Sequence, residues 1–107
     1  MEINKINEEA LKCFMEDMKG GKAVLLDVRT KEEWDTGHAE NAIHFELARL
    51  EAGELPEIPK DKAICVYCAA GGRAEAAKSI LASKGFSNVK NIGGLRDWKL
   101  AGGKVIT

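Results

Sequence analysis

The chain has 107 residues, of which 45% are hydrophobic and 31% are charged, a composition typical of one globular domain. Sixteen basic residues stand against seventeen acidic ones, and this balance argues against a nucleic-acid or membrane-surface partner, because both kinds of partner select basic patches. The N-terminal stretch lacks the apolar segment of a signal peptide, and the longest apolar run is too short to span a bilayer, so we expect a cytoplasmic protein.

The first half of the chain alternates helical patterns with short apolar runs. A helix is predicted from Glu8 to about Lys19, with Asn7 as its N-cap and Gly20-Gly21 ending it. Its apolar face repeats at helical spacing through Leu11, Phe14, Met15 and Met18. AVLLDV and AIHF are predicted strands, and ELARLEAG is a predicted helix. In TKEEWDTG, Thr30 stands three residues before Glu33, and this spacing predicts a capping box at the start of a short helix.

The second half repeats the same alternation. AICVYC predicts a strand that ends at Cys68, and a second long helix is expected from Arg73 to about Lys84. VKNI is the last strand candidate, and GLRDWKLAG predicts a closing helix. Alternating strands and helices predict an α/β fold, in which a parallel sheet is covered by helices on both faces. Sites in such sheets form at the carboxyl ends of the strands, where Asp27 and Cys68 are expected.

The three cysteines, Cys13, Cys65 and Cys68, are an odd number, which argues against a disulfide framework. Cys65 and Cys68 have CxxC spacing, but in a strand their Cα atoms would be ~10 Å apart and their side chains would point to opposite faces. A zinc site would need two further ligands, and His38 and His44 lack the usual paired spacing. We therefore predict no metal site.

The segment CAAGGR is the strongest candidate for chemistry. It comprises Cys68, Ala69, Ala70, Gly71, Gly72 and Arg73. Small residues leave room for a loop whose backbone N–H groups turn toward a bound anion, and the following helix adds the positive end of its dipole. Both features favour the thiolate, which is the nucleophilic form of cysteine. The alternative is a buried cysteine that merely closes a strand.

Three motifs in the right order resemble the rhodanese-like sulfurtransferase family: DVRTKEEWDTGHAENAIH, CAAGGR and IGGLRDW. The resemblance runs from about Val24 to Trp98. It implies that residues 1–107 form a single rhodanese-like domain of three layers, with a five-stranded parallel sheet. It also implies a sulfurtransferase that moves a sulfane sulfur from thiosulfate or a persulfide, through a persulfide on Cys68, to a nucleophilic acceptor such as a thiol. This cycle needs no metal or organic cofactor, the donor can be a small molecule or a persulfide-bearing protein, and we expect a monomer.

Other residues of these motifs have expected supporting roles. Asp27 is expected to tether the loop or a neighbouring arginine rather than to act as a general base, and Arg29 belongs to the same supporting set. His38 is expected to be a hydrogen-bonded turn residue. Trp34 and Trp98 are expected to pack in the core or at its rim.

Two other functions compete with sulfur transfer. Cysteine phosphatases and arsenate reductases of similar fold have five residues between cysteine and arginine, whereas four separate Cys68 from Arg73. A non-enzymatic sulfur carrier or binding module is the second alternative, although binding modules of this family often lack the cysteine.

Two features of the loop bear on its donor. Arg73 could hold the loop through an ion pair or present its charge to an anionic donor. Ala69 and Ala70 stand where many thiosulfate-using loops carry a basic or polar residue, which predicts poor turnover of thiosulfate.

Overall fold

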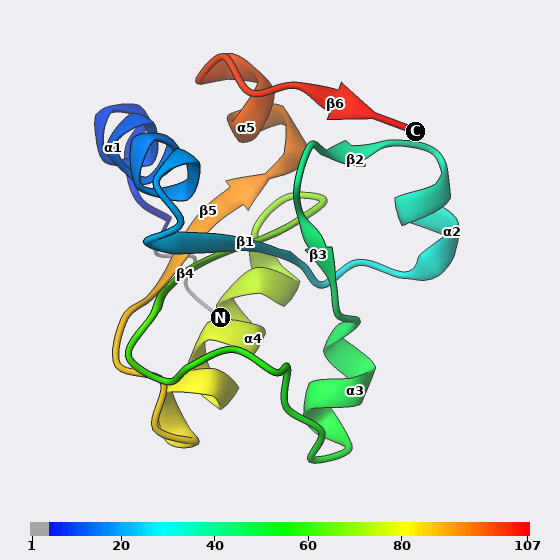
Figure 1. The fold of residues 1–107 in the computed structure, drawn as a ribbon. Helices are drawn as coiled ribbons and strands as arrows, with labels where there is room; N and C mark the ends of the chain where they lie inside the picture. Colours follow the sequence, from blue (N-terminus) through cyan, green and yellow to red (C-terminus); the bar gives the residue numbers. More distant parts are fainter. Residues whose placement is uncertain (1–4) are drawn as a thin grey trace.

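A parallel sheet between two layers of helices organises the molecule (Figure 1), as seen in a computed structural model that describes residues 5–107. The strand order is β3-β1-β4-β5. These strands are β1 (Ala23–Asp27), β3 (Ile43–His44), β4 (Ala63–Cys68) and β5 (Val89–Gly94). Strand β4 lies in the interior of the sheet and is buried along nearly its whole length, which explains its continuous apolar sequence.

The expectation of five parallel strands is not confirmed, because the sheet has four across residues 5–107. At the outer edge of β5, Lys5 forms one isolated parallel bridge with Asn91, and the Ile6 N–H donates to the Asn91 carbonyl oxygen at 2.8 Å. A separate antiparallel pair joins β2 (His38–Ala39) to β6 (Val105–Ile106). Strands of two residues are too short to produce a recognisable alternation in the sequence.

The helices are α1 (Glu8–Lys19), α2 (Lys31–Asp35), α3 (Leu47–Glu51), α4 (Gly72–Ser83) and α5 (Leu95–Leu100). Two of the helices, α1 and α2, begin where the capping signals predict. The Asn7 side chain accepts the Ala10 N–H at 2.8 Å and caps α1. Thr30 and Glu33 form the predicted capping box of α2. Within residues 5–107, no helix has both the length and the apolarity needed to cross a membrane.

The sheet divides the hydrophobic core into two. Helices α3 and α4 cover one face, and α1 and α5 cover the other (Figure 1). Because side chains alternate along a strand, neighbouring residues of β4 enter different cores. Cys68 packs in the α3/α4 core and Cys65 in the α1/α5 core, which confirms that the two thiols lie on opposite faces of the sheet.

The pairing of strands brings the predicted site residues to one edge of the sheet. Asp27, at the end of β1, is in register with Tyr67 of β4. Cys68 is the next residue of β4 and pairs with Gly94 at the end of β5. The carboxyl ends of three neighbouring strands therefore meet where α4 begins.

Candidate active site

Cys68 is the last residue of β4, and the chain turns sharply after it. The Gly71 N–H points back and donates to the Cys68 Sγ at an N–S distance of 2.9 Å. Gly71 has φ +109°, a conformation that a residue with a side chain rarely adopts, and α4 starts at the next residue. The sulfur thus receives a backbone N–H next to the positive end of a twelve-residue helix.

The rim of this loop differs from its base. Ala69, Ala70 and Gly72 are exposed, whereas Cys68 is 1% exposed and Gly71 is buried. The loop residues that face solvent therefore carry no charge and no side chain larger than a methyl group. The predicted arrangement of small residues around the sulfur is present.

Two residues of β5, Gly94 and Asn91, contact the cysteine loop and support it. Gly94 lies against Ala69 so closely that a Cβ at position 94 would overlap the Ala69 carbonyl oxygen. Asn91 is fully buried, and its Nδ2 donates to the Gly71 carbonyl oxygen at 3.0 Å and to Glu75 Oε1 at 3.0 Å. Asn91 thereby connects β5, the loop and α4. Its role was not predicted, because Asn91 follows the polar Lys90 in the strand VKNI and does not stand out in the sequence.

Arg73 forms an ion pair with Glu33 of α2. Its two terminal nitrogens donate to the two carboxylate oxygens at 2.6 and 2.9 Å, the bidentate geometry that guanidinium favours. Glu33 also accepts the hydroxyl and N–H of Thr30. The hydrogen bonds from Arg73, together with those from Thr30, lower the pKa of Glu33 to about 2, against the opposing effect of burial. Of the two roles left open for Arg73, the geometry favours holding the loop.

A buried network joins the ends of β1 and β4. The Asp27 carboxylate accepts the Arg29 N–H at 2.8 Å, Arg29 Nη2 at 2.8 Å and the Tyr67 hydroxyl at 2.5 Å. Arg29 Nη2 also donates to the Gly37 carbonyl oxygen, and the Ala39 N–H donates to the Tyr67 oxygen. Burial first, and the Asp27 hydrogen bond second, raise the pKa of Tyr67. Asp27 therefore tethers a neighbouring arginine, as expected, and the part of Tyr67 was not predicted.

The histidines of the first motif pack around Trp34. The His38 ring stacks on the Trp34 ring with centroids 3.5 Å apart, and its Nδ1 lies 3.1 Å from the Trp34 carbonyl oxygen. His44 stacks on the same ring at 4.8 Å, and its Nε2 lies 2.8 Å from the Arg29 carbonyl oxygen. His38 is thus hydrogen-bonded, as predicted, but it begins strand β2 and does not lie in a turn. Trp98 is buried in the α1/α5 core, in line with the packing role expected for it.

The fold and the cysteine loop together define a class of protein. The Rhodanese-like domain family matches residues 10–101, which is most of the chain. The chain therefore belongs to the rhodanese-like family, as the three motifs indicated.

Particular relatives carry more specific names. The chain is 36% identical over 73 residues to the thiosulfate sulfurtransferase PspE of Escherichia coli, an alignment that covers 67% of this chain and 70% of the relative. It is 30% identical over 97 residues to a sulfurtransferase of Allochromatium vinosum, covering 90% and 88% of the two chains. Among solved structures, a rhodanese-related protein of Thermoplasma volcanium superposes with a TM-score of 0.76 at 30% identity, covering 96% of this chain and 97% of that one.

Proposed function

We propose that this chain is a sulfurtransferase in which Cys68 carries the transferred sulfur as a persulfide. One observation carries the proposal: the Cys68 Sγ accepts the Gly71 N–H at the start of α4. Membership of a family with named sulfurtransferases supports it.

The reaction has two half-steps. In the first, the Cys68 thiolate attacks the outer sulfur of the donor, and an S–S bond forms on Cys68. The bond between that outer sulfur and the rest of the donor breaks, and the leaving group departs with the electron pair of that bond. With thiosulfate the leaving group is sulfite. In the second, an acceptor such as a thiolate or cyanide attacks the terminal sulfur and releases the Cys68 thiolate. Atoms and electrons balance with donor and acceptor alone, so the cycle requires no cofactor.

The loop favours the anions of this cycle. The Gly71 N–H and the positive end of the α4 dipole stabilise negative charge on the thiolate, and the same dipole favours the persulfide anion. Cys68 is only 1% exposed, and the exposed residues next to it, Ala69 and Ala70, have side chains no larger than a methyl group.

The charge around the loop bears on the donor. Ala69 and Ala70 are exposed and neutral, and the Arg73 guanidinium is paired with Glu33. Thiosulfate is a dianion, and a charge-assisted hydrogen bond to such a ligand is worth about 1.5–3 kcal/mol. We therefore propose that thiosulfate is a poor donor and that a protein or low-molecular-weight persulfide is the better one.

The competing functions fit the site less well. Only four residues separate Cys68 from Arg73, a loop short for the three equatorial oxygens of a phosphoryl group. A phosphatase arginine must also be free to bind oxyanion, whereas both terminal nitrogens of Arg73 engage Glu33. A sulfur carrier without turnover would form the persulfide but would not release its sulfur to a small acceptor.

Turnover with matched donors tests the proposal. Cyanide serves as acceptor, and thiocyanate is measured with thiosulfate or with glutathione persulfide at equal concentration. We expect thiocyanate with both and faster formation with the persulfide. Hydrolysis of an aryl phosphate without any thiocyanate formation would instead identify the chain as a phosphatase. A higher rate with thiosulfate than with glutathione persulfide would contradict the proposed donor preference.

A further inference from the structure

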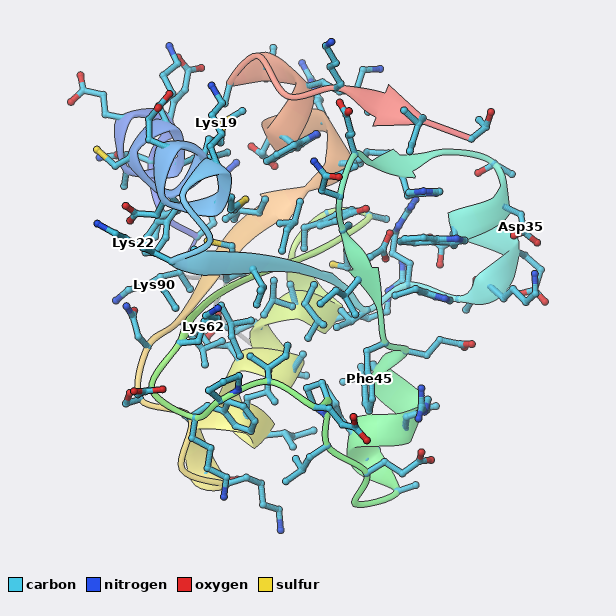
Figure 2. All side chains as sticks on the ribbon, in the orientation of Figure 1. Lys19, Lys22, Asp35, Phe45, Lys62 and Lys90 are labelled. Carbon is cyan, nitrogen blue, oxygen red and sulfur yellow. The ribbon has the colours of Figure 1, made fainter. Side chains whose placement is uncertain are left out.

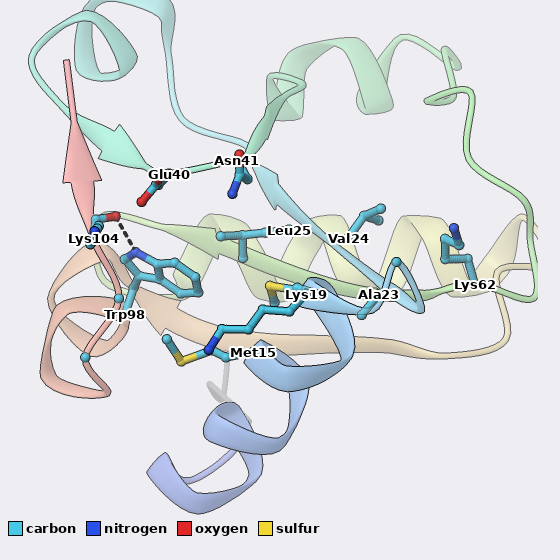
Figure 3. A pocket seen from close by; sticks show the side chains of 14 residues that line it. Met15, Lys19, Ala23, Val24, Leu25, Glu40, Asn41, Lys62, Trp98 and Lys104 are labelled. Carbon is cyan, nitrogen blue, oxygen red and sulfur yellow. Dashed lines mark hydrogen bonds between the residues drawn. The ribbon is translucent and has the colours of Figure 1, made fainter.

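A cavity of about 700 Å³ lies on the α1/α5 face of the sheet, within the ~300–1,000 Å³ typical of small-molecule sites. Loop residues 68–73 are all described, and none of them lines it. The cavity follows from the shortness of β3: pairing with β1 begins at Leu26, so within residues 5–107 no strand lies beside Ala23–Leu25 on that edge. The space is bounded instead by α1, α5 and the turn after β2 (Figure 3).

The floor and walls of the cavity are apolar. Met15, Met18, Leu25 and Trp98 supply them. The Trp98 ring is fixed in place, because its Nε1–H donates to the Lys104 carbonyl oxygen at 2.7 Å and because Gly103 lies so close that a Cβ there would overlap the ring. The aromatic wall is thus preformed, as in sites that bind small molecules without rearrangement.

Basic groups dominate the rim. Lys19, Lys62 and Lys104 line the cavity, against the single acidic residue Glu40. Lys62 is half-buried, and within residues 5–107 neither it nor Lys104 has an ion-pair partner. Lys19 pairs with Glu16 at 3.3 Å, an exposed pair of little energetic value.

The lysines lie at different parts of the rim, with Lys62 at the Ala23 end and Lys104 at the Trp98 end (Figure 3). Lys19 and Lys62 lie on the side of the molecule where β1 begins (Figure 2). The Lys19 side chain extends from α1 toward the Trp98 side of the cavity (Figure 3). An apolar cavity with a surplus of positive charge at its rim is complementary to an amphipathic anion.

We propose that this cavity is a second binding site, independent of Cys68, for a small organic anion with an apolar body, such as a medium-chain monocarboxylate. The chain or ring of the ligand lies on Met15, Met18 and Leu25 and against the Trp98 ring. The carboxylate lies at the rim, where the charges of Lys19, Lys62 and Lys104 together outweigh that of Glu40. A cation of the same shape is repelled by these groups, and a neutral alcohol loses their attraction.

Three probes of equal chain length test the charge preference. The full chain carrying Trp34→Phe is titrated with decanoate, decanol or decyltrimethylammonium, so that Trp98 is the fluorescent reporter. We expect a saturable one-to-one change with decanoate, weakened by added salt, affinity about tenfold lower for decanol, and no saturable change with the cation. Backbone amide shifts of Gly21 and Gly103 in the unmodified chain provide the same measurement without any substitution.

Single lysine variants locate the ligand. Lys62→Ala and Lys104→Ala are each expected to lower decanoate affinity about two- to fivefold, the usual value of a partly exposed ionic contact. Lys84→Ala, at the exposed C-cap of α4, is the matched control and is expected to bind as the unmodified chain does. Equal affinity for the three probes, equal loss in Lys84→Ala and Lys62→Ala, or no saturable binding of decanoate below its micelle concentration overturns the proposal.

Discussion

Cys65 and Cys68 lie on the same strand and are equally buried, at 0% and 1% exposure, yet their surroundings differ in kind. The Cys65 thiol is enclosed by the α1/α5 core, and burial first, with the Asp17 charge second, raises its pKa to about 12. The Cys68 sulfur sits at the strand end and accepts the Gly71 N–H. Burial alone therefore does not determine whether a cysteine is suited to chemistry. We propose that the backbone N–H and the helix N-terminus at the strand end are what suit Cys68 to sulfur transfer.

Removing each thiol in turn is the most direct test of this comparison. Cys68→Ser is expected to lower sulfur transfer about a thousandfold or more, since it removes the proposed nucleophile. Cys65→Ala is expected to keep the activity and to lose about 1 kcal/mol of unfolding free energy through the small void it leaves. Thiocyanate formation and urea unfolding measure both effects. Comparable loss of activity in a folded Cys65→Ala would show that the CxxC pair acts as a unit.

The fit of the loop against β5 is tested by Gly94→Ala. Its added Cβ would overlap the Ala69 carbonyl oxygen, so we expect the loop to shift and activity to fall about tenfold, as strain of ~1–3 kcal/mol implies. Gly72→Ala is the control, because a Cβ there meets nothing within 4 Å; its activity is expected to stay within about twofold of the wild-type value. If both variants behave alike, the contact with Gly94 does not position the loop.

The ion pair that holds the loop can be followed by pH. The folded-state pKa of Glu33 is about 2, below its ordinary value of 4.5, so its stabilisation is fully present above pH 4.5 and is lost as pH falls toward 2. Both partners are about one-third exposed, and screening by solvent reduces the contribution to about 1 kcal/mol. Glu33→Gln is expected to lower the unfolding free energy by that amount at pH 7.

Urea unfolding at several pH values checks this prediction. The difference between wild type and Glu33→Gln is expected to shrink as pH falls from 4.5 toward 2. Glu32→Gln, an exposed neighbour on the same helix, is expected to change little. A difference that stays constant with pH contradicts the assigned ion pair.

The smallest expected effect concerns the neutral rim. Ala69→Arg places a positive charge beside the cysteine and is expected to lower the KM for thiosulfate about threefold at low ionic strength, with the gain fading as salt is added. Ala69→Gln, which adds length without charge, is the control. An equal change in the two variants, or none in either, means that rim charge does not select the donor.

The local signals in the sequence predicted much of this molecule. The bounds of α1, the capping box at Thr30 and the strand that ends at Cys68 agree with the structure, because caps and apolar periodicity act over a few neighbouring residues. Asp27 with Arg29 was also foreseen, since the two are close in sequence.

What the sequence did not reveal depends on contacts between distant segments. Tyr67 reads as one more apolar position of β4, yet its hydroxyl joins Asp27 and Ala39. Asn91 reads as part of a weak strand, yet it supports the loop through Gly71. The strands β2 and β6 lie far apart in the sequence, since His38 pairs with Ile106. No local pattern marks two-residue strands that pair over such a separation.

Intact-protein mass measurement after exposure to a sulfur donor tests the central claim most directly. The wild-type chain is mixed with glutathione persulfide, freed of excess donor and measured, and the same is done for Cys68→Ser and Cys65→Ala. We predict one added sulfur atom in the wild type and in Cys65→Ala, its removal by cyanide with release of thiocyanate, and no cyanide-labile sulfur in Cys68→Ser. An unmodified wild-type chain, or a cyanide-labile sulfur that persists in Cys68→Ser, would contradict the assignment of Cys68 as the sulfur-carrying residue.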